Sequence, residues 1–207
     1  MSGARGRTMA GRIAMVSAAG GVAITVAVAT GAGWTVERWG LAARGLGWIA
    51  LAALVLARAA SPVEGIAARV TARAARVPFG ALRRAFGITS ALAALVHAVL
   101  SASAFVAPAW VTLVTWPHLR FGLSALAILC ALAVTSFASV LRVLRLRLWK
   151  PLHRASYAAG ALALLHLLSA PAAPRVTVLA LFGALLALRV VALVARRPTD
   201  ATSVPEP

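Results

Sequence analysis

Long uncharged stretches, separated by short arginine-rich links, restrict the fold of this chain more than any other feature. The first, residues 13–34, contains 22 residues without a charge, and about 20 apolar residues are enough for a helix to cross the hydrocarbon core of a bilayer. Because backbone groups inside a bilayer must be hydrogen-bonded within the protein, such stretches form helices. We therefore predict an all-α, polytopic membrane helix bundle with six transmembrane helices, residues 13–34, 46–57, 85–107, 121–141, 153–169 and 176–195.

The first stretch also fits a cleaved signal peptide, because Ala27-Val28-Ala29 has the small-residue pattern of a cleavage site. The second stretch is short, but arginines at its two ends can reach the headgroups with their side chains. Ser61-Pro62 is expected to end that second helix, since the residue before a proline disfavours helical geometry. Beyond it we predict a short helix lying on the membrane surface, with three arginines on one face: Arg69, Arg73 and Arg76.

Basic residues indicate how the bundle is oriented. Most of the 21 Lys and Arg residues fall at the N-terminus, in the links after the second and fourth helices, and at Arg196-Arg197, while Arg189 lies inside the sixth helix. The densest basic segment is the predicted loop between the fourth and fifth helices, with Arg142, Arg145, Arg147, Lys150 and Arg154. Basic residues remain on the cytoplasmic side of a membrane, so both termini are predicted to be cytoplasmic. The chain then divides into a basic N-terminus (1–12), one six-helix transmembrane domain (13–195) and a polar tail (196–207).

The net charge of +17 would suit a nucleic-acid-binding protein, but the arginines lie between apolar helices, where they face anionic lipid. The chain has 62% hydrophobic and 12% charged residues, against about half and about a quarter in soluble domains. It is therefore predicted to bind the lipid bilayer and no nucleic acid. Its one cysteine, Cys130, lies within an apolar stretch, which excludes a disulfide framework, a thiolate cluster and covalent c-type haem attachment. We expect Cys130 to serve in packing.

Two histidines are predicted to lie at one depth on different helices. His97 follows Arg84 by 13 residues and His166 follows Arg154 by 12 residues, so both lie about 18 to 20 Å beyond the basic edge of the membrane. Polar residues are expensive inside a bilayer unless they pair, ligate or relay. Neutral imidazoles from two helices can hold one haem iron from opposite faces, in a six-coordinate b-type site suited to electron transfer. The other interpretation of such histidines is an ordinary hydrogen bond between helices.

His153 precedes His166 by 13 residues and is predicted to lie near the cytoplasmic surface, too far away to serve the same iron. No histidine stands opposite it, because the position 14 residues before His97 is Arg83. Three roles stay open: His153 holds a second haem, hydrogen-bonds a propionate or quinone, or is simply an interfacial histidine. His118, on a predicted loop beside Pro117, is expected to be solvated.

The residues around His153 resemble a known family. The pattern Trp149-x-x-Leu152-His153-Arg154-x-x-Tyr157, with His166 following, resembles the ferric-reductase-like transmembrane domain. Within that family it resembles the haem-binding membrane subunit of the bacterial methionine sulfoxide reductase system. The resemblance covers about residues 46–195. Three weaker matches support it: Thr135-Ser136, Ser61-Pro62, and Arg83-Arg84-x-x-Gly87 with His97 following.

The resemblance implies a b-type haem protein of the bacterial cytoplasmic (inner) membrane, with His97, His153 and His166 as haem ligands. It implies that electrons come from quinol or a flavin donor, with FMN or quinone as a further cofactor, and pass to a periplasmic molybdenum-cofactor reductase. Relatives with two haems have a histidine where Arg83 stands, so one haem or two remains open. Because the sequence given stops at Pro207, we expect the reductant to be a separate protein, a free flavin or a quinol.

We therefore expect an electron-transfer subunit of an oxidoreductase system, with substrate reduction on a partner. One alternative uses the same core: a reductase acting directly on ferric or cupric ions at the outer face. Another is a non-redox membrane scaffold or transporter, which the scarcity of carboxylates within the apolar stretches disfavours.

Overall fold

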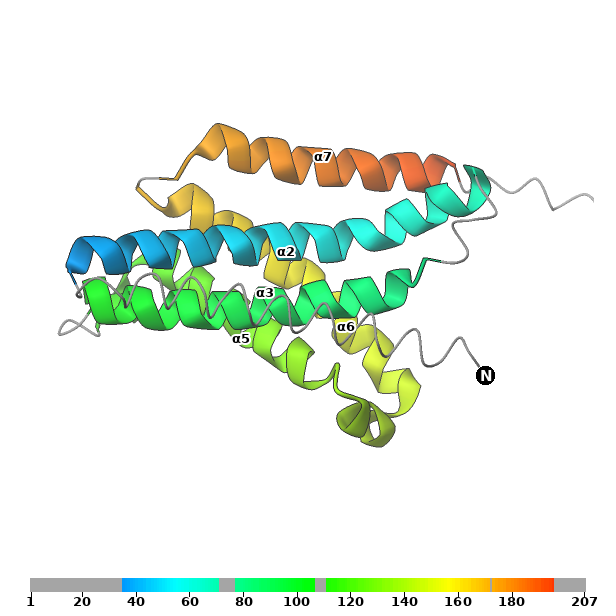
Figure 1. Cartoon of the computed structure of the whole chain (residues 1–207), viewed down its shortest axis with the longest axis horizontal. Helices are drawn as coiled ribbons and strands as arrows, with labels where there is room; N and C mark the ends of the chain where they lie inside the picture. Colours follow the sequence, from blue (N-terminus) through cyan, green and yellow to red (C-terminus); the bar gives the residue numbers. More distant parts are fainter. Residues whose placement is uncertain (1–34, 71–76, 107–110, 172, 196–207) are drawn as a thin grey trace, which may run out of the picture.

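The computed structural model describes residues 35–70, 77–106, 111–171 and 173–195. This part of the chain is all helical and contains no strand, so the prediction of an all-α membrane helix bundle is confirmed (Figure 1). The helices are α2 (Val36–Val70), α3 (Phe79–Ser101), the π-helical turn η2 (Ala102–Val106), α4 (Thr112–Thr115), α5 (Pro117–Val134), α6 (Ala138–Ser169) and α7 (Arg175–Val194).

Four helices in the described part are long and apolar enough to cross a membrane: α2, α3 with its π-helical extension, α5 and α7. Helix α6 is long as well, but its first half is rich in arginine, and it carries His153 at its middle and His166 near its end. The first predicted span, residues 13–34, lies outside the described residues. The total of six spans and the cytoplasmic position of both termini therefore stay predictions.

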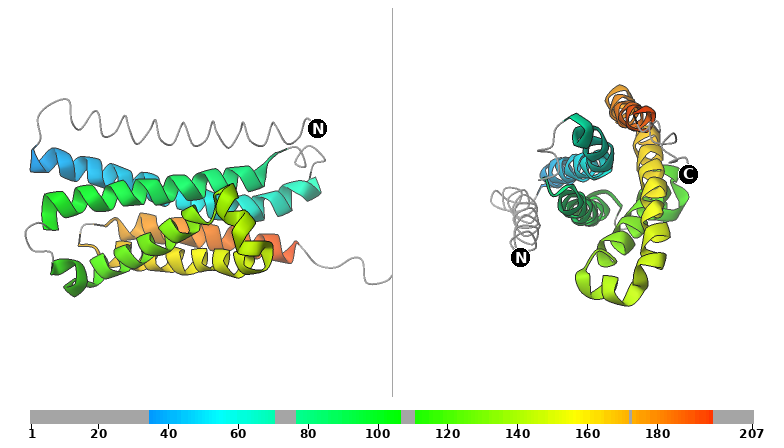
Figure 2. Two further views of the ribbon diagram at one scale, coloured as in Figure 1. Left: turned by 90° about the horizontal axis from the view of Figure 1, so that it is seen from below. Right: turned by 90° about the vertical axis from the view of Figure 1, so that its right-hand side faces the viewer.

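Helices α2 and α3 form the tightest pair of the bundle and lie side by side (Figures 1 and 2). Their contact is made mostly of alanines, whose small side chains let the two backbones approach closely. Ser90 of α3 strengthens it by donating its hydroxyl to the Ala50 carbonyl of α2 at 2.9 Å. A second buried cluster joins four helices through one residue from each: Leu54 of α2, Ala91 of α3, Leu129 of α5 and Ala159 of α6.

Helix α7 lies at the edge of the bundle and leaves most of its surface uncovered (Figure 2). Large apolar side chains along it are exposed, including Val176 and Leu186. In water such a surface would drive association, but in a bilayer it faces lipid tails that are equally apolar. The exposed surface of α7 is therefore the surface expected of a membrane span.

Helix α2 is longer than the sequence indicated. Ser61-Pro62 does not end it, because the helix continues to Val70 with Pro62 buried inside it. Proline is tolerated within membrane helices when neighbouring helices compensate for the lost hydrogen bond. The separate surface helix is therefore wrong for residues 61–70, which belong to α2 and include Arg69. Arg73 and Arg76 lie outside the described residues.

The boundary between the fourth and fifth predicted helices was also wrong. Helix α5 ends at Val134 rather than near residue 141, because the hydroxyls of Thr135 and Ser136 both donate to the Leu132 carbonyl, at 3.1 and 2.7 Å. Such bonds compete with the helical ladder and end it. The segment predicted to be a basic loop is instead helical and forms the first half of α6, since arginine and leucine are good helix formers.

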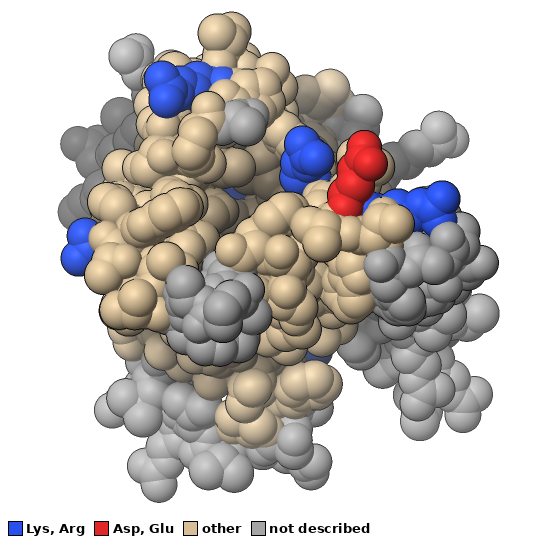
Figure 3. Space-filling model, turned by 90° about the vertical axis from the view of Figure 1, so that its left-hand side faces the viewer, with Lys and Arg blue, Asp and Glu red and all other residues tan. Residues whose placement is uncertain are grey.

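The end of the bundle where α2 begins carries few charged side chains (Figure 3). The predicted orientation makes this end the outer one. The basic residues on the segments that meet there, within the described part, are Arg38, Arg44, Arg120 and Arg175.

Candidate functional site

The structure brings the rings of His97 and His166 together. His97 lies on α3 and His166 near the end of α6, and their ring centroids are 6.4 Å apart with an angle of 73° between the ring planes. Both helices run in the same direction through the bundle (Figure 1), so counting residues from their basic starts places the two rings at one level. The side chains that the sequence analysis paired by depth are neighbours.

Each of these imidazoles is anchored by a backbone carbonyl of a neighbouring helix. Nδ1 of His97 lies 2.7 Å from the Ala43 carbonyl of α2, and Nδ1 of His166 lies 2.7 Å from the His118 carbonyl of α5. A carbonyl oxygen only accepts, so Nδ1 carries the proton and donates it in both bonds. In its neutral form, each ring then has the tautomer whose Nε2 lone pair is available to a metal.

A glycine follows each of these carbonyls by one helical turn. Gly47 stands four residues after Ala43, and a Cβ built on it would lie 3.1 Å from Nδ1 of His97. Gly122 stands four residues after His118, and a Cβ there would lie 2.9 Å from Nδ1 of His166. The rings occupy the space that a larger side chain would take, so these two glycines are part of the site.

The sequence analysis missed both glycines. A glycine inside a helix costs about 1 kcal/mol relative to alanine, which is a signal that something else requires it. Sequence alone shows neither which helix each histidine faces nor at what register. The pairing of Gly47 with His97 and of Gly122 with His166 therefore becomes visible only in the packed bundle.

His118 is placed differently from the prediction. It lies in the first turn of α5 rather than on a loop, because Pro117 occupies the first helical position, where proline is favoured. Its ring is partly buried, with its centroid 6.3 Å from that of His166 and 5.5 Å from that of Trp116. His118 is thus a third imidazole beside the pair, and its carbonyl positions His166.

The separation of the two rings fits two imidazoles that bind one iron. Two metal–nitrogen bonds of about 2 Å each, together with half the width of each imidazole ring, require ring centroids about 6 Å apart. The observed 6.4 Å meets this requirement. Within the described residues, no three His, Cys, Asp or Glu side chains gather closely enough to hold a metal ion by themselves. His97 and His166 are therefore the residues that would bind an iron already held by a macrocycle.

His153 does not join the pair. It lies on α6, 13 residues before His166, which is about 20 Å along the helix. Its side chain is half-buried, and its carbonyl accepts the Ser156 hydroxyl at 2.6 Å. Its role as a ligand stays a prediction. Cys130 has a free, partly buried thiol on α5.

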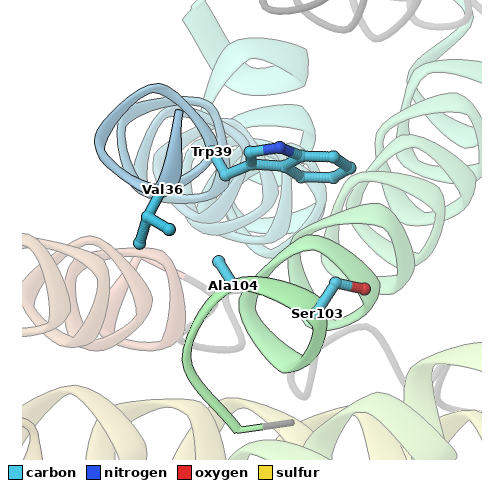
Figure 4. A pocket seen from close by; sticks show the side chains of 4 residues that line it. All are labelled: Val36, Trp39, Ser103 and Ala104. Atoms are coloured by element: carbon cyan, nitrogen blue, oxygen red, sulfur yellow. The ribbon is translucent and has the colours of Figure 1, made fainter. Parts of the chain in front are cut away.

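A shallow hollow opens between the start of α2 and η2 (Figure 4). It measures about 220 Å³ and is lined by Val36, Trp39, Ser103 and Ala104. Trp39 lies one helical turn before Ala43, whose carbonyl anchors His97. The histidine pair therefore lies close to this end of the bundle.

The family described as ferric reductase like transmembrane component matches residues 46–164, which is more than half of the chain. The match includes Gly47, His97, Gly122 and His153, and it stops two residues before His166. No curated protein and no solved structure matches the chain.

Proposed function

Because the chain belongs to the family of ferric-reductase-like transmembrane components, we propose that it carries electrons through a b-type haem held between His97 and His166. Membership of the family and the membrane helix bundle support a membrane electron-transfer function. When bound, the haem would supply an iron that accepts and releases one electron at a time.

The observation that carries the proposal is that the two imidazoles make the same kind of hydrogen bond. Each ring donates Nδ1–H to a carbonyl and keeps Nε2 for coordination. Metal-ligating histidines are commonly oriented in this way, because the second hydrogen bond fixes the tautomer and raises the basicity of the ligand. Two imidazoles that both bound the iron would favour the transfer of single electrons over the binding of a substrate at the metal.

Beyond the haem, we propose that the chain is the electron-transfer subunit of a two-component system in the bacterial cytoplasmic membrane. The donor would be a quinol or a flavin, and the acceptor a periplasmic molybdenum-cofactor reductase. The resemblance around His153 and Tyr157 supports this assignment. The position of the pair near the end that the basic residues predict to be outer agrees with delivery to an outer acceptor.

Four histidine variants test the ligands. Purified His97→Ala and His166→Ala proteins are expected to lose the reduced-minus-oxidised haem band. His118→Ala is the matched control, because its ring lies beside the pair while its contribution to His166 comes from the backbone. A band that persists in both of the first two variants would reject the assignment. The haem-to-protein ratio of His153→Ala, against that of the unmodified chain, distinguishes one haem from two.

The description of the matched family favours one alternative, a reductase that acts directly on ferric or cupric ions. It predicts that the chain alone, reconstituted into vesicles with an internal reductant, reduces an external iron or copper chelate. The two-component proposal predicts slow chelate reduction until the partner reductase is added.

A further inference from the structure

Two arginines from two helices contact one tyrosine in the half of the bundle away from the histidine pair, and a third arginine lies near them. The guanidinium of Arg58 (α2) lies 3.4 Å from the centroid of the Tyr157 ring (α6), and that of Arg189 (α7) lies 4.6 Å from it. Arg189 also donates to the Tyr157 hydroxyl, and Arg58 donates to the Ser156 hydroxyl at 2.8 Å. Arg83 (α3) donates to the Ser61 hydroxyl at 3.4 Å. We call Arg58, Arg83 and Arg189 the arginine cluster.

The charges of the arginine cluster are not balanced within the described part of the chain. Arg58 is repelled by both Arg83 and Arg189. Glu37 and Glu64 are the acidic residues of that part, and neither forms an ion pair with the cluster. Arginine does not lose its proton in proteins, and partly buried cations are costly unless an anion accompanies them. The hydroxyls and the ring supply acceptors but no negative charge.

The arginine cluster also has hydrogen-bonding capacity to spare. Nε of Arg189 is buried and donates to no acceptor among the described residues. Among the described residues, the hydroxyl and ring contacts occupy only some of the five N–H groups of each guanidinium. Tyr157 is 49% exposed, so a small group can reach the cluster from outside the bundle.

The depth of the arginine cluster indicates what kind of anion it meets. Arg189 stands five residues before the end of α7, and Arg83 stands four residues after the start of α3. These separations place both within about 6 to 8 Å of a helix end, on the side that the basic residues predict to be cytoplasmic. Long arginine side chains extend from this depth to the headgroup region, where the anionic group is a phosphate.

We propose that the arginine cluster binds a phosphate group, brought by an anionic phospholipid headgroup or by a phosphate-bearing soluble ligand. A guanidinium group can donate two parallel N–H hydrogen bonds to two oxygens of one phosphate. The guanidinium groups of Arg58 and Arg189 both lie against the Tyr157 ring, so one phosphate beside the ring can contact both. The phosphate site does not require a haem, so its test is independent of the proposed function.

The test measures thermal unfolding of the full chain in a neutral maltoside detergent, which contains no phosphate. Three probes are added separately: phosphatidylglycerol in the micelles, inorganic phosphate at constant ionic strength, and FMN. We expect at least one probe to raise the unfolding temperature of the unmodified chain. Stabilisation by phosphatidylglycerol alone identifies a lipid site, and stabilisation by phosphate or FMN identifies a soluble ligand. No stabilisation by any probe would overturn the proposal without the use of a variant.

Variants then locate the site. Arg58→Gln and Arg189→Gln are each expected to weaken the affinity for the effective probe about ten- to hundredfold, as the loss of a charge-assisted hydrogen bond does. Arg84→Gln is the matched control, because this exposed arginine adjoins Arg83 without joining the arginine cluster. Equal stabilisation of all variants would overturn the proposal. Loss of haem from Arg58→Gln or Arg189→Gln would also overturn it, because the cluster would then serve a haem carboxylate.

Discussion

The two halves of the bundle accommodate polar side chains in opposite ways. At one level, the neutral rings of His97 and His166 are each satisfied by a backbone carbonyl and seated against a glycine. About 14 Å further along α6, Arg58 and Arg189 of the arginine cluster lie against the ring of Tyr157, and no carboxylate of the described residues pairs with them. The histidine pair depends on the space around its rings, whereas the arginine cluster depends on the charges around it.

This difference shows what a membrane bundle can complete by itself. A neutral imidazole needs one acceptor, and a backbone carbonyl near a glycine supplies it without any other polar side chain. A guanidinium needs a counter-charge, which the described part of the chain does not offer. Changes of volume should therefore disturb the histidine pair, whereas changes of charge or of surrounding anions should disturb the arginine cluster.

The largest effect, a loss of haem affinity, is expected from Gly122→Ala. The added Cβ would lie 2.9 Å from Nδ1 of His166, so the ring must move and its bond to the His118 carbonyl is strained. Loss of such a supporting bond weakens metal affinity about ten- to hundredfold, and haem titration should show this fall. Gly47→Ala, with its closest approach at 3.1 Å, should have a smaller effect.

Gly87→Ala is the control for both changes, because nothing lies within 4 Å of a Cβ at this position of α3. It should leave haem affinity unchanged and stabilise the helix by up to about 1 kcal/mol. If Gly122→Ala binds haem as tightly as Gly87→Ala does, the space beside His166 is not limiting and the contrast between the two halves is lost.

A smaller effect is expected from Arg189→Leu, which should raise the stability of the protein. In neutral detergent without phosphate, removing a cation that lacks a counter-charge should stabilise the protein by about 1 to 3 kcal/mol, as replacement of buried charges by apolar residues often does. The haem spectrum should not change. Denaturant unfolding measures the stability, with Arg175→Leu at the exposed start of α7 as the control. Destabilisation by Arg189→Leu would mean that its charge is already balanced within the chain.

The contrast also explains what the sequence could predict. The depth of His97 and His166 follows from the constant rise of a helix, so counting residues from Arg84 and Arg154 was sufficient to place them at one level. Helix ends were harder, because they depend on side chains that compete locally. The hydroxyls of Thr135 and Ser136 end α5, whereas Pro62 does not end α2.

Contacts between helices could not be predicted in this way. The seating of His166 against Gly122 requires the relative rotation of α5 and α6, which sequence periodicity does not give. Arg189 stood out only as a charge inside the last apolar stretch. Its contact with Tyr157 and its closeness to Arg58 depend on how α7 docks beside α2 and α6. Sequence therefore gives the depth of polar residues in this chain, and packing gives their partners.

The smallest effect is expected from Tyr157→Phe. The change removes the hydroxyl that accepts from Arg189 but keeps the ring under Arg58. A lost hydrogen bond to a partly exposed group should cost about 0.5 to 1.5 kcal/mol of unfolding free energy. Tyr157→Leu should cost about 0.5 to 1 kcal/mol more, because the cation–π contacts go as well. Both variants should keep the haem band of the unmodified chain. A weaker haem band in Tyr157→Phe would mean that the two halves of the bundle are coupled through α6, so that Tyr157 supports the haem as well as the arginine cluster.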